Sequence, residues 1–145
     1  MKRLTLTIDS NLGDVSLVGI AINKICIYLG LDEDQAGKME LCIVEAVTNA
    51  IRHAYHGKPG QSVAIEITAN AEHVDFDVSD SGTPMSEEQV KSLIHGGAAN
   101  DESLSNLATL PEGGRGLQII RDTVDRVQYI RKGPRNHLRL SKNLN

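Results

Sequence analysis

The segment Glu40-Leu-Cys-Ile-Val-Glu-Ala-Val-Thr-Asn-Ala-Ile-Arg-His-Ala-Tyr55 has the clearest periodicity in the chain. At roughly 100° per residue its apolar side chains fall on one face, which we expect to pack on a sheet. These apolar residues are Val44, Val47, Ile51 and Ala54. The opposite face is polar and carries Glu45, Asn49, Arg52 and His53. The segment therefore predicts the second half of an amphipathic helix that spans residues 32–55.

Two residues on the polar face are unusual for a helix that merely faces water. Asn49 is a poor mid-helix residue because its side chain competes for backbone hydrogen bonds. It lies one turn after Glu45, so a carboxylate and an amide oxygen point in the same direction. A carboxylate can orient a nucleophile or accept its proton, and an amide oxygen suits Mg²⁺. The residues alone leave both explanations open, a functional pair or a solvated helix face.

The rest of the chain supplies strands and further helices around this segment. Alternating apolar residues predict strands near residues 4–8, 63–67, 74–78, 127–131 and 137–141, and helical spacing predicts helices at 12–29, 86–94 and 116–125. Strands that cluster without a βαβ repeat favour an α/β two-layer sandwich, with a mixed, mostly antiparallel sheet and its helices on one face. We expect one domain over residues 1–145, with a loop at residues 95–114.

Two glycine-containing segments lie at the ends of predicted elements, one directly after a strand and the other directly before a helix. Asp80-Ser-Gly82 comes directly after a strand, and its carboxylate could accept a hydrogen bond from an exocyclic amine such as N6 of adenine. Gly-Gly-Arg-Gly at residues 113–116 leads into a helix, where backbone amides can approach an anion. Taken separately, an ordinary turn explains Asp80-Ser-Gly82 at least as well, and it explains the glycine-rich stretch better.

Composition excludes several other classes of protein. A net charge of -4 gives no electrostatic reason to expect a direct nucleic-acid partner. No window approaches the roughly 20 apolar residues that span a bilayer, so we expect no membrane segment and a cytoplasmic location. Cys26 and Cys42 lie in apolar helical patterns and are expected to be buried, reduced thiols.

Together the three motifs resemble those of the GHKL ATPase superfamily, and most of all its anti-sigma-factor serine kinases. Glu45-Ala-Val-Thr-Asn49-Ala-Ile-Arg-His53-Ala resembles the N box of that superfamily. Asp80-Ser-Gly82 resembles its first glycine box, and Gly114-Arg-Gly116-Leu117 its second. The resemblance implies a Bergerat-type ATP-binding fold, with the loop at residues 95–114 as the ATP lid.

The resemblance also implies a role for each motif residue. Glu45 would be the general base and Asn49 the Mg²⁺ ligand, with His53 in a supporting position near the nucleotide. Asp80 would recognise adenine, and Gly82 would give the ring access. The second glycine box would contact the phosphates through Gly114, Gly116 and the adjoining Leu117.

Three positions depart from the pattern of the family. Pro84 stands where the first glycine box has a second glycine, and Asn136 lies in the last strand where a Thr often lies near the adenine. No Lys or Arg occurs between Gly96 and Gly114, although related kinases place a cation there for the γ-phosphate. Arg115 is the nearest candidate to replace that cation.

By resemblance, the chain is expected to be an ATP-dependent protein serine kinase that phosphorylates a serine of an antagonist protein, binds a sigma factor and forms a homodimer. A non-catalytic, nucleotide-dependent switch that displays a partner surface is the alternative. A detached histidine-kinase catalytic domain would need a phosphoacceptor His on a partner helix, and a nucleotide-free scaffold is the fourth hypothesis.

Overall fold

The computed structural model describes residues 1–94 and 112–144. Five strands, four α-helices, one short 3-10 helix and one π-helical turn follow one another within these residues. In chain order they are β1 (Lys2–Asp9), η1 (Leu12–Asp14), α1 (Val15–Tyr28), α2 (Glu33–Asn49), η2 (Ala50–Ala54), β2 (Ser62–Ala69), β3 (His73–Asp80), α3 (Glu87–Ile94), α5 (Glu112–Thr123), β4 (Arg126–Lys132) and β5 (Arg135–Asn143).

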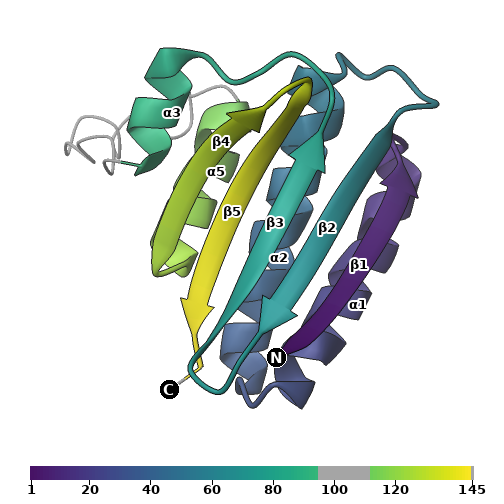
Figure 1. Ribbon diagram of the computed structural model, residues 1–145. Coiled ribbons are helices and arrows are strands. Elements are labelled where there is room, and N and C mark those ends of the chain that lie inside the picture. The colour runs from purple at the N-terminus through teal and green to yellow at the C-terminus, as the bar shows by residue number, and fades with distance from the viewer. Residues whose placement is uncertain (95–111, 145) are drawn as a thin grey trace.

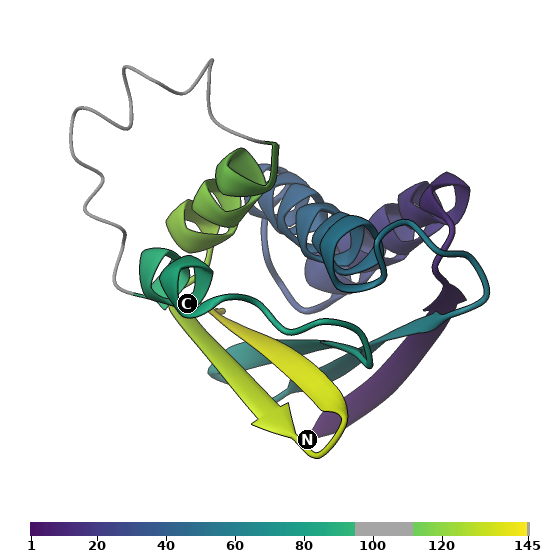
Figure 2. The same cartoon turned by 90° about the horizontal axis from the view of Figure 1, so that it is seen from above.

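The strands form one sheet in the order β1-β2-β3-β5-β4. All four neighbouring pairs are antiparallel, so this sheet is antiparallel throughout rather than mixed. Helices α1, α2 and α5 cover one face of the sheet, as Figures 1 and 2 show from two directions. The predicted two-layer α/β sandwich is confirmed.

The core lies between the sheet and these helices and is built mainly from aliphatic side chains. The alternating residues of β2 and β3 that point toward the helices are fully or almost fully buried, as their period of two predicts. Phe76 in β3 is the chain's one phenylalanine and the largest fully buried side chain among the described residues. Because the chain has so few aromatic residues, its core is filled mainly by Val, Ile, Leu and Ala side chains.

The long helix of the sequence prediction is correct at its start and different at its end. Asp32 caps α2, because its carboxylate accepts from the amide of Gln35 at 2.8 Å while the Gln35 side chain binds back to the Asp32 amide. After Asn49, however, the helix widens to a π-helical turn through Ala54. Such turns are rare and are found frequently at functional sites.

The two faces of α2 also differ in two respects from the expectation. Val44 is only partly buried, unlike Val47 and Ile51 of the expected apolar face. It is half-buried beside α1, and a Cβ atom added to Gly19 would lie 2.9 Å from its Cγ2. Glu45 and Asn49 do not face open solvent either, because both are half-buried on the side of α2 that packs against α5. The helix therefore has three packed directions rather than one apolar and one wet face.

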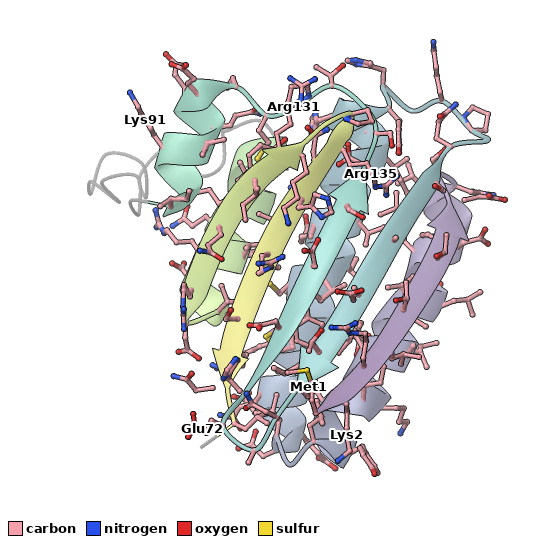
Figure 3. All side chains as sticks on the ribbon, in the orientation of Figure 1. Met1, Lys2, Glu72, Lys91, Arg131 and Arg135 are labelled. Atoms are coloured by element: carbon pink, nitrogen blue, oxygen red, sulfur yellow. The ribbon has the colours of Figure 1, made fainter. Side chains whose placement is uncertain are left out.

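The face of the sheet away from the helices carries polar and charged side chains (Figure 3). Asp77 is buried there, and its carboxylate is bonded to Nδ1 of His137 at 2.9 Å and to the guanidinium of Arg139 at 3.0 Å. These partners offset the cost of burying the carboxylate.

Among the described residues, no helix is long and apolar enough to cross a membrane.

Candidate functional site

A cavity of about 250 Å³ opens at the end of the sheet where β3 finishes and β5 begins. The end of α2, its π-helical turn, the start of α3 and one side of α5 complete its walls. Four residues singled out from the sequence line it, namely Asn49, His53, Asp80 and Leu117. The remaining wall is largely apolar and includes Ala46, Ala50, Val78, Met85, Tyr129 and Leu138. An apolar slot with a few placed polar groups is typical of a small-molecule site.

Asp80 is an acidic residue in the wall of this cavity. It is the last residue of β3 and is buried. Its Oδ1 accepts two hydrogen bonds, from the amide of Gly82 at 2.9 Å and from Nδ2 of Asn136 at 2.8 Å. Within the described part of the chain no hydrogen bond reaches Oδ2. One oxygen therefore fixes the carboxylate, and the other remains free to accept a hydrogen bond from a ligand.

Gly82 lets the chain pass directly over the end of the α2–η2 helix. A Cβ atom at this position would overlap with the carbonyl oxygen of Ala54 and lie 2.9 Å from the Cβ of Ala54. The same carbonyl accepts a hydrogen bond from the amide of Thr83 at 2.9 Å. Only glycine fits this close approach, which explains why the motif requires it.

The strap, which we define as residues 81–85, is fixed at both of its ends by tyrosine hydroxyls. Oη of Tyr55 accepts from the amide of Ser81 at 2.7 Å and donates to the carbonyl of Ser62 at 2.7 Å. Oη of Tyr129 accepts from the amide of Met85 at 2.9 Å. The rim of the cavity is therefore a braced segment rather than a free loop.

Sequence reasoning missed both of these tyrosines. Burial, chiefly, raises the pKa of Tyr129 from its ordinary value, so its hydroxyl keeps its proton and can still donate it. Tyr129 lies in a strand with ordinary alternation, and Tyr55 lies at the end of a helix next to turn residues. Neither position carries a motif. The rarity of aromatic residues, 3% of the chain, was the only available signal.

Glu45, Asn49 and Gly116 meet where α2 packs on α5. A Cβ atom added to Gly116 would lie 2.7 Å from Oε2 of Glu45 and 3.3 Å from Nδ2 of Asn49. Nδ2 of Asn49 is buried and has no hydrogen-bond partner in the described part of the protein. Glu45 does not line the cavity, whereas Asn49, one helical turn later, does.

The second glycine motif lies inside a helix rather than in front of one. Helix α5 begins at Glu112, four residues before the predicted start at Gly116. Gly116 and Leu117 are buried in it, against α2 and the cavity. The side chain of Arg115 lies outside the described residues, so its predicted role has no observed geometry. Residues 95–111, where the lid is predicted, are outside them too.

The residues present fit a bound ATP and Mg²⁺ on chemical grounds. In the wall of the cavity, Oδ2 of Asp80 accepts no hydrogen bond from the described residues and is an open acceptor. Gly82 faces the main chain of Ala54 rather than the cavity, so the structure gives it a packing role. Asn49 lines the same cavity, and its unpaired Nδ2 marks a place for a ligand. A half turn of the amide exchanges its nitrogen and oxygen, so this position can present an oxygen to a hard cation. Among the described residues, no three or more His, Cys, Asp or Glu side chains gather as a metal-binding group.

This fold and this site define a class of nucleotide-binding domain, and comparison with known proteins agrees. The family model described as "Histidine kinase-like ATPase domain" matches residues 8–142 of the chain. The chain therefore belongs to this family.

Two groups of relatives make the position within the family more specific. The serine-protein kinase RsbW of Staphylococcus aureus (strain MRSA252) is 32% identical over 119 residues, which are 81% of this chain and 72% of the relative. The RsbW of Listeria monocytogenes (serotype 4b, strain F2365) is 24% identical over 126 residues, 87% of this chain and 78% of the relative. The predicted resemblance to the GHKL anti-sigma-factor kinases, and the class of ATP-binding serine kinase that it implies, is confirmed by these relatives.

Solved structures support the fold. The RsbU and RsbW domains of Rv1364c from Mycobacterium tuberculosis match with a TM-score of 0.65 at 14% identity, covering 98% of this chain and 32% of that one. The SiaB–SiaC complex from Pseudomonas aeruginosa matches with a TM-score of 0.61 at 15% identity, covering 94% of this chain and 88% of that one.

Proposed function

We propose that this chain binds Mg²⁺-ATP in the cavity beside Asp80 and transfers the terminal phosphoryl group to a serine of an antagonist protein. The observation that carries the proposal is that two polar groups with free hydrogen-bonding capacity line one largely apolar cavity. Oδ2 of Asp80 accepts no hydrogen bond from the described residues, and Nδ2 of Asn49 has no partner among them. A nucleotide has a base with hydrogen-bond donors at one end and phosphates at the other.

At the base end, Asp80 accepts a hydrogen bond from the 6-amino group of adenine, and Gly82 lets the strap cross close to Ala54 beside the site. The apolar wall covers the two faces of the ring, with Ala50 from η2, Met85 from the strap and Leu138 from β5. His53 is exposed at the rim of the cavity and supports the ribose or the phosphates from there.

At the phosphate end, Asn49 binds the cation, and the free backbone amides in the first turn of α5, which includes Gly114, approach the phosphates. Gly116 follows this turn and instead lets α5 pack closely on Glu45. Glu45, one turn before Asn49, orients the serine hydroxyl of the substrate and accepts its proton. Bound Mg²⁺ supplies neutralisation of charge on the phosphates. Arg115 is the residue that we assign to the γ-phosphate, since residues 96–114 contain no Lys or Arg.

The protein partners follow from the relatives rather than from a feature of the surface. We propose that a sigma factor and its antagonist are the partners, and that the protein acts as a homodimer in the cytoplasm. We also propose that the sequence 1–145 is a single ATPase domain, since its five strands belong to one sheet.

The test has two stages. Calorimetric titration with ATP, in the presence and absence of Mg²⁺, measures binding. Incubation with γ-labelled ATP and the protein encoded by the neighbouring gene then measures phosphotransfer, with a serine-to-alanine version of that substrate as the control. Failure to bind ATP would remove the whole proposal.

A nucleotide-dependent switch without catalysis is the second candidate. It is favoured by one observation, namely that Glu45 lies behind Asn49 and does not line the cavity. A protein that binds Mg²⁺-ATP with normal affinity but labels no partner would support this second function and exclude the first.

A further inference from the structure

Asn136 is a polar residue in a position that otherwise belongs to the core. It is the second residue of β5, and the next two residues on the same face of the strand are the buried Leu138 and Leu140. Asn136 itself is only 1% exposed. Because amides are seldom buried without a purpose, this position calls for an explanation.

The amide nitrogen of Asn136 uses both of its hydrogens at the base end of the cavity. Nδ2 donates to Oδ1 of Asp80 at 2.8 Å and to the carbonyl of Gly82 at 2.9 Å. The geometry also fixes which atom is the nitrogen. A flipped amide would place its oxygen against a carboxylate and a carbonyl, which are both acceptors.

The other amide atom shows that folding stability alone does not explain this residue. Oδ1 of Asn136 is buried and has no hydrogen-bond partner among the described residues. A buried acceptor without a partner is costly, and an apolar side chain of the same shape would remove that cost. The amide nitrogen supplies two donors on a single atom. These donors link the carboxylate of Asp80 to the carbonyl of Gly82 in the strap.

We propose that Asn136 is a positioning residue that sets base specificity, by holding Asp80 so that Oδ2 accepts a hydrogen bond from a 6-aminopurine. This inference rests on the proposed ATP site. Nδ2 and the amide of Gly82 together occupy Oδ1, which leaves Oδ2 as the acceptor for the ligand. A base with a carbonyl at this place, such as guanine, would set acceptor against acceptor and be rejected.

No smaller or acidic residue supplies the same arrangement. A threonine or serine hydroxyl carries one hydrogen and can bind either Asp80 or the Gly82 carbonyl, but not both. An aspartate carries no donor when ionised and would repel Asp80. Among uncharged or acidic side chains that fit this buried position, the two-donor bridge is therefore specific to an amide.

The experiment compares ATP with purine riboside triphosphate, which lacks the 6-amino group but is otherwise the same size. Wild-type protein is expected to bind ATP more tightly by about tenfold, the value of one hydrogen bond to a charged group. The Asn136→Leu variant, which keeps the volume and removes both donors, is expected to lose most of this preference. The affinity of the Asn136→Leu variant for the analogue should differ from that of the wild type by less than about twofold, which is the usual deviation between independent effects.

Equal losses for the two nucleotides would overturn the inference, because a merely structural role of Asn136 affects both. Asn136→Thr, with one donor, provides a second reading if the leucine variant does not fold, and it should keep part of the preference. Ser141→Ala, on the other face of β5, removes a hydrogen bond to Asp75 and is the control for general destabilisation. A wild-type protein that binds neither nucleotide would instead overturn the proposed ATP site itself.

Discussion

Gly116 in α5 lies directly against the carboxylate of Glu45 in α2, so closely that an added Cβ atom would be 2.7 Å from Oε2. The second glycine motif is therefore in direct contact with the N-box helix. The atom that would be displaced is the end of a flexible side chain and not backbone. This distinguishes Gly116 from Gly82, whose neighbour is the main chain of Ala54.

Gly116→Ala should therefore fold almost normally and still lose activity. Replacing glycine by alanine within a helix gains up to about 1 kcal/mol of helix propensity, which offsets the cost of moving Glu45. The carboxylate itself must move, and a displacement of about 1 Å can lower a rate by about 100-fold. Urea unfolding measures the stability, and phosphotransfer to the antagonist protein measures the activity. A variant with normal activity would show that the position of Glu45 is not critical.

Gly82→Ala should instead destabilise the protein and weaken ATP binding together. The new methyl group overlaps with the carbonyl of Ala54, which cannot move without breaking its bond to Thr83. Overpacking of this kind costs about 1–3 kcal/mol. Displacement of the strap should also weaken ATP binding, which titration measures.

Gly37→Ala is the matched control for both glycine variants. Gly37 lies within α2, and an added Cβ would meet nothing within 4 Å. We expect a small gain in the free energy of unfolding, about 0.5–1 kcal/mol, with unchanged ATP affinity. A loss of stability in this control would mean that the contact distances do not predict the cost of the added methyl group.

The two thiols should be unreactive in the folded protein. Burial raises the pKa of Cys26 to about 11 and, mainly by the same cause, that of Cys42 to about 12, from 9.0. The reactive thiolate is thus disfavoured in addition to being shielded. At pH 8 a thiol reagent should label both cysteines only in urea, whereas Lys38→Cys, at an exposed position, should be labelled at once.

The same shifts predict how stability depends on pH. Above pH 9 the unfolded chain loses its thiol protons, while the folded protein keeps them until the pH exceeds about 11. The unfolded state then binds fewer protons, so the free energy of unfolding falls as the pH rises through this window. The double variant Cys26→Ala/Cys42→Ala should show a weaker decline in urea unfolding between pH 9 and 11. An unchanged slope would contradict the assigned shifts.

The sequence predicted the sheet well because alternation reports directly on burial. The apolar residues of β2 and β3 alternate in sequence, and these inward residues are buried, although Asp77 and Ser79 on the other face of β3 are buried as well. The order and spacing of the motifs also predicted that Asp80 and Asn49 belong to one site, although they are 31 residues apart. Both line the same cavity, because the fold brings the two motifs together. The motif residues needed no side-chain detail to be found.

What the sequence could not predict depends on contacts between elements. Periodicity at 100° per residue is blind to the π-helical turn at Ala50–Ala54, since the change in hydrogen bonding leaves no mark on residue types. It also treated α2 as having two faces, because the pattern cannot show that α1 packs on Val44 and α5 on Glu45. Tyr55 and Tyr129 were missed for a similar reason, since they act through hydroxyls bonded to the backbone of distant residues.

Glu45 and Asn49 should separate catalysis from binding, although they lie one turn apart on α2. Glu45→Gln keeps the shape of the side chain and removes the proposed proton acceptor, so Mg²⁺-ATP affinity should stay within about threefold while phosphotransfer falls by about 100-fold or more. Asn49→Ala removes the proposed cation ligand, so the difference in ATP affinity between Mg²⁺ and EDTA should shrink.

Glu40→Gln is the matched control, because this carboxylate lies on the same helix but lines a groove beside α1 rather than the cavity. It should leave both ATP affinity and transfer unchanged. Calorimetry in Mg²⁺ and in EDTA, followed by single-turnover phosphotransfer, distinguishes the three variants. If Glu45→Gln transferred phosphate at the wild-type rate, the base would have to be another residue. The position of Glu45 behind Asn49 would then be purely structural, its carboxylate serving only to pack against Gly116.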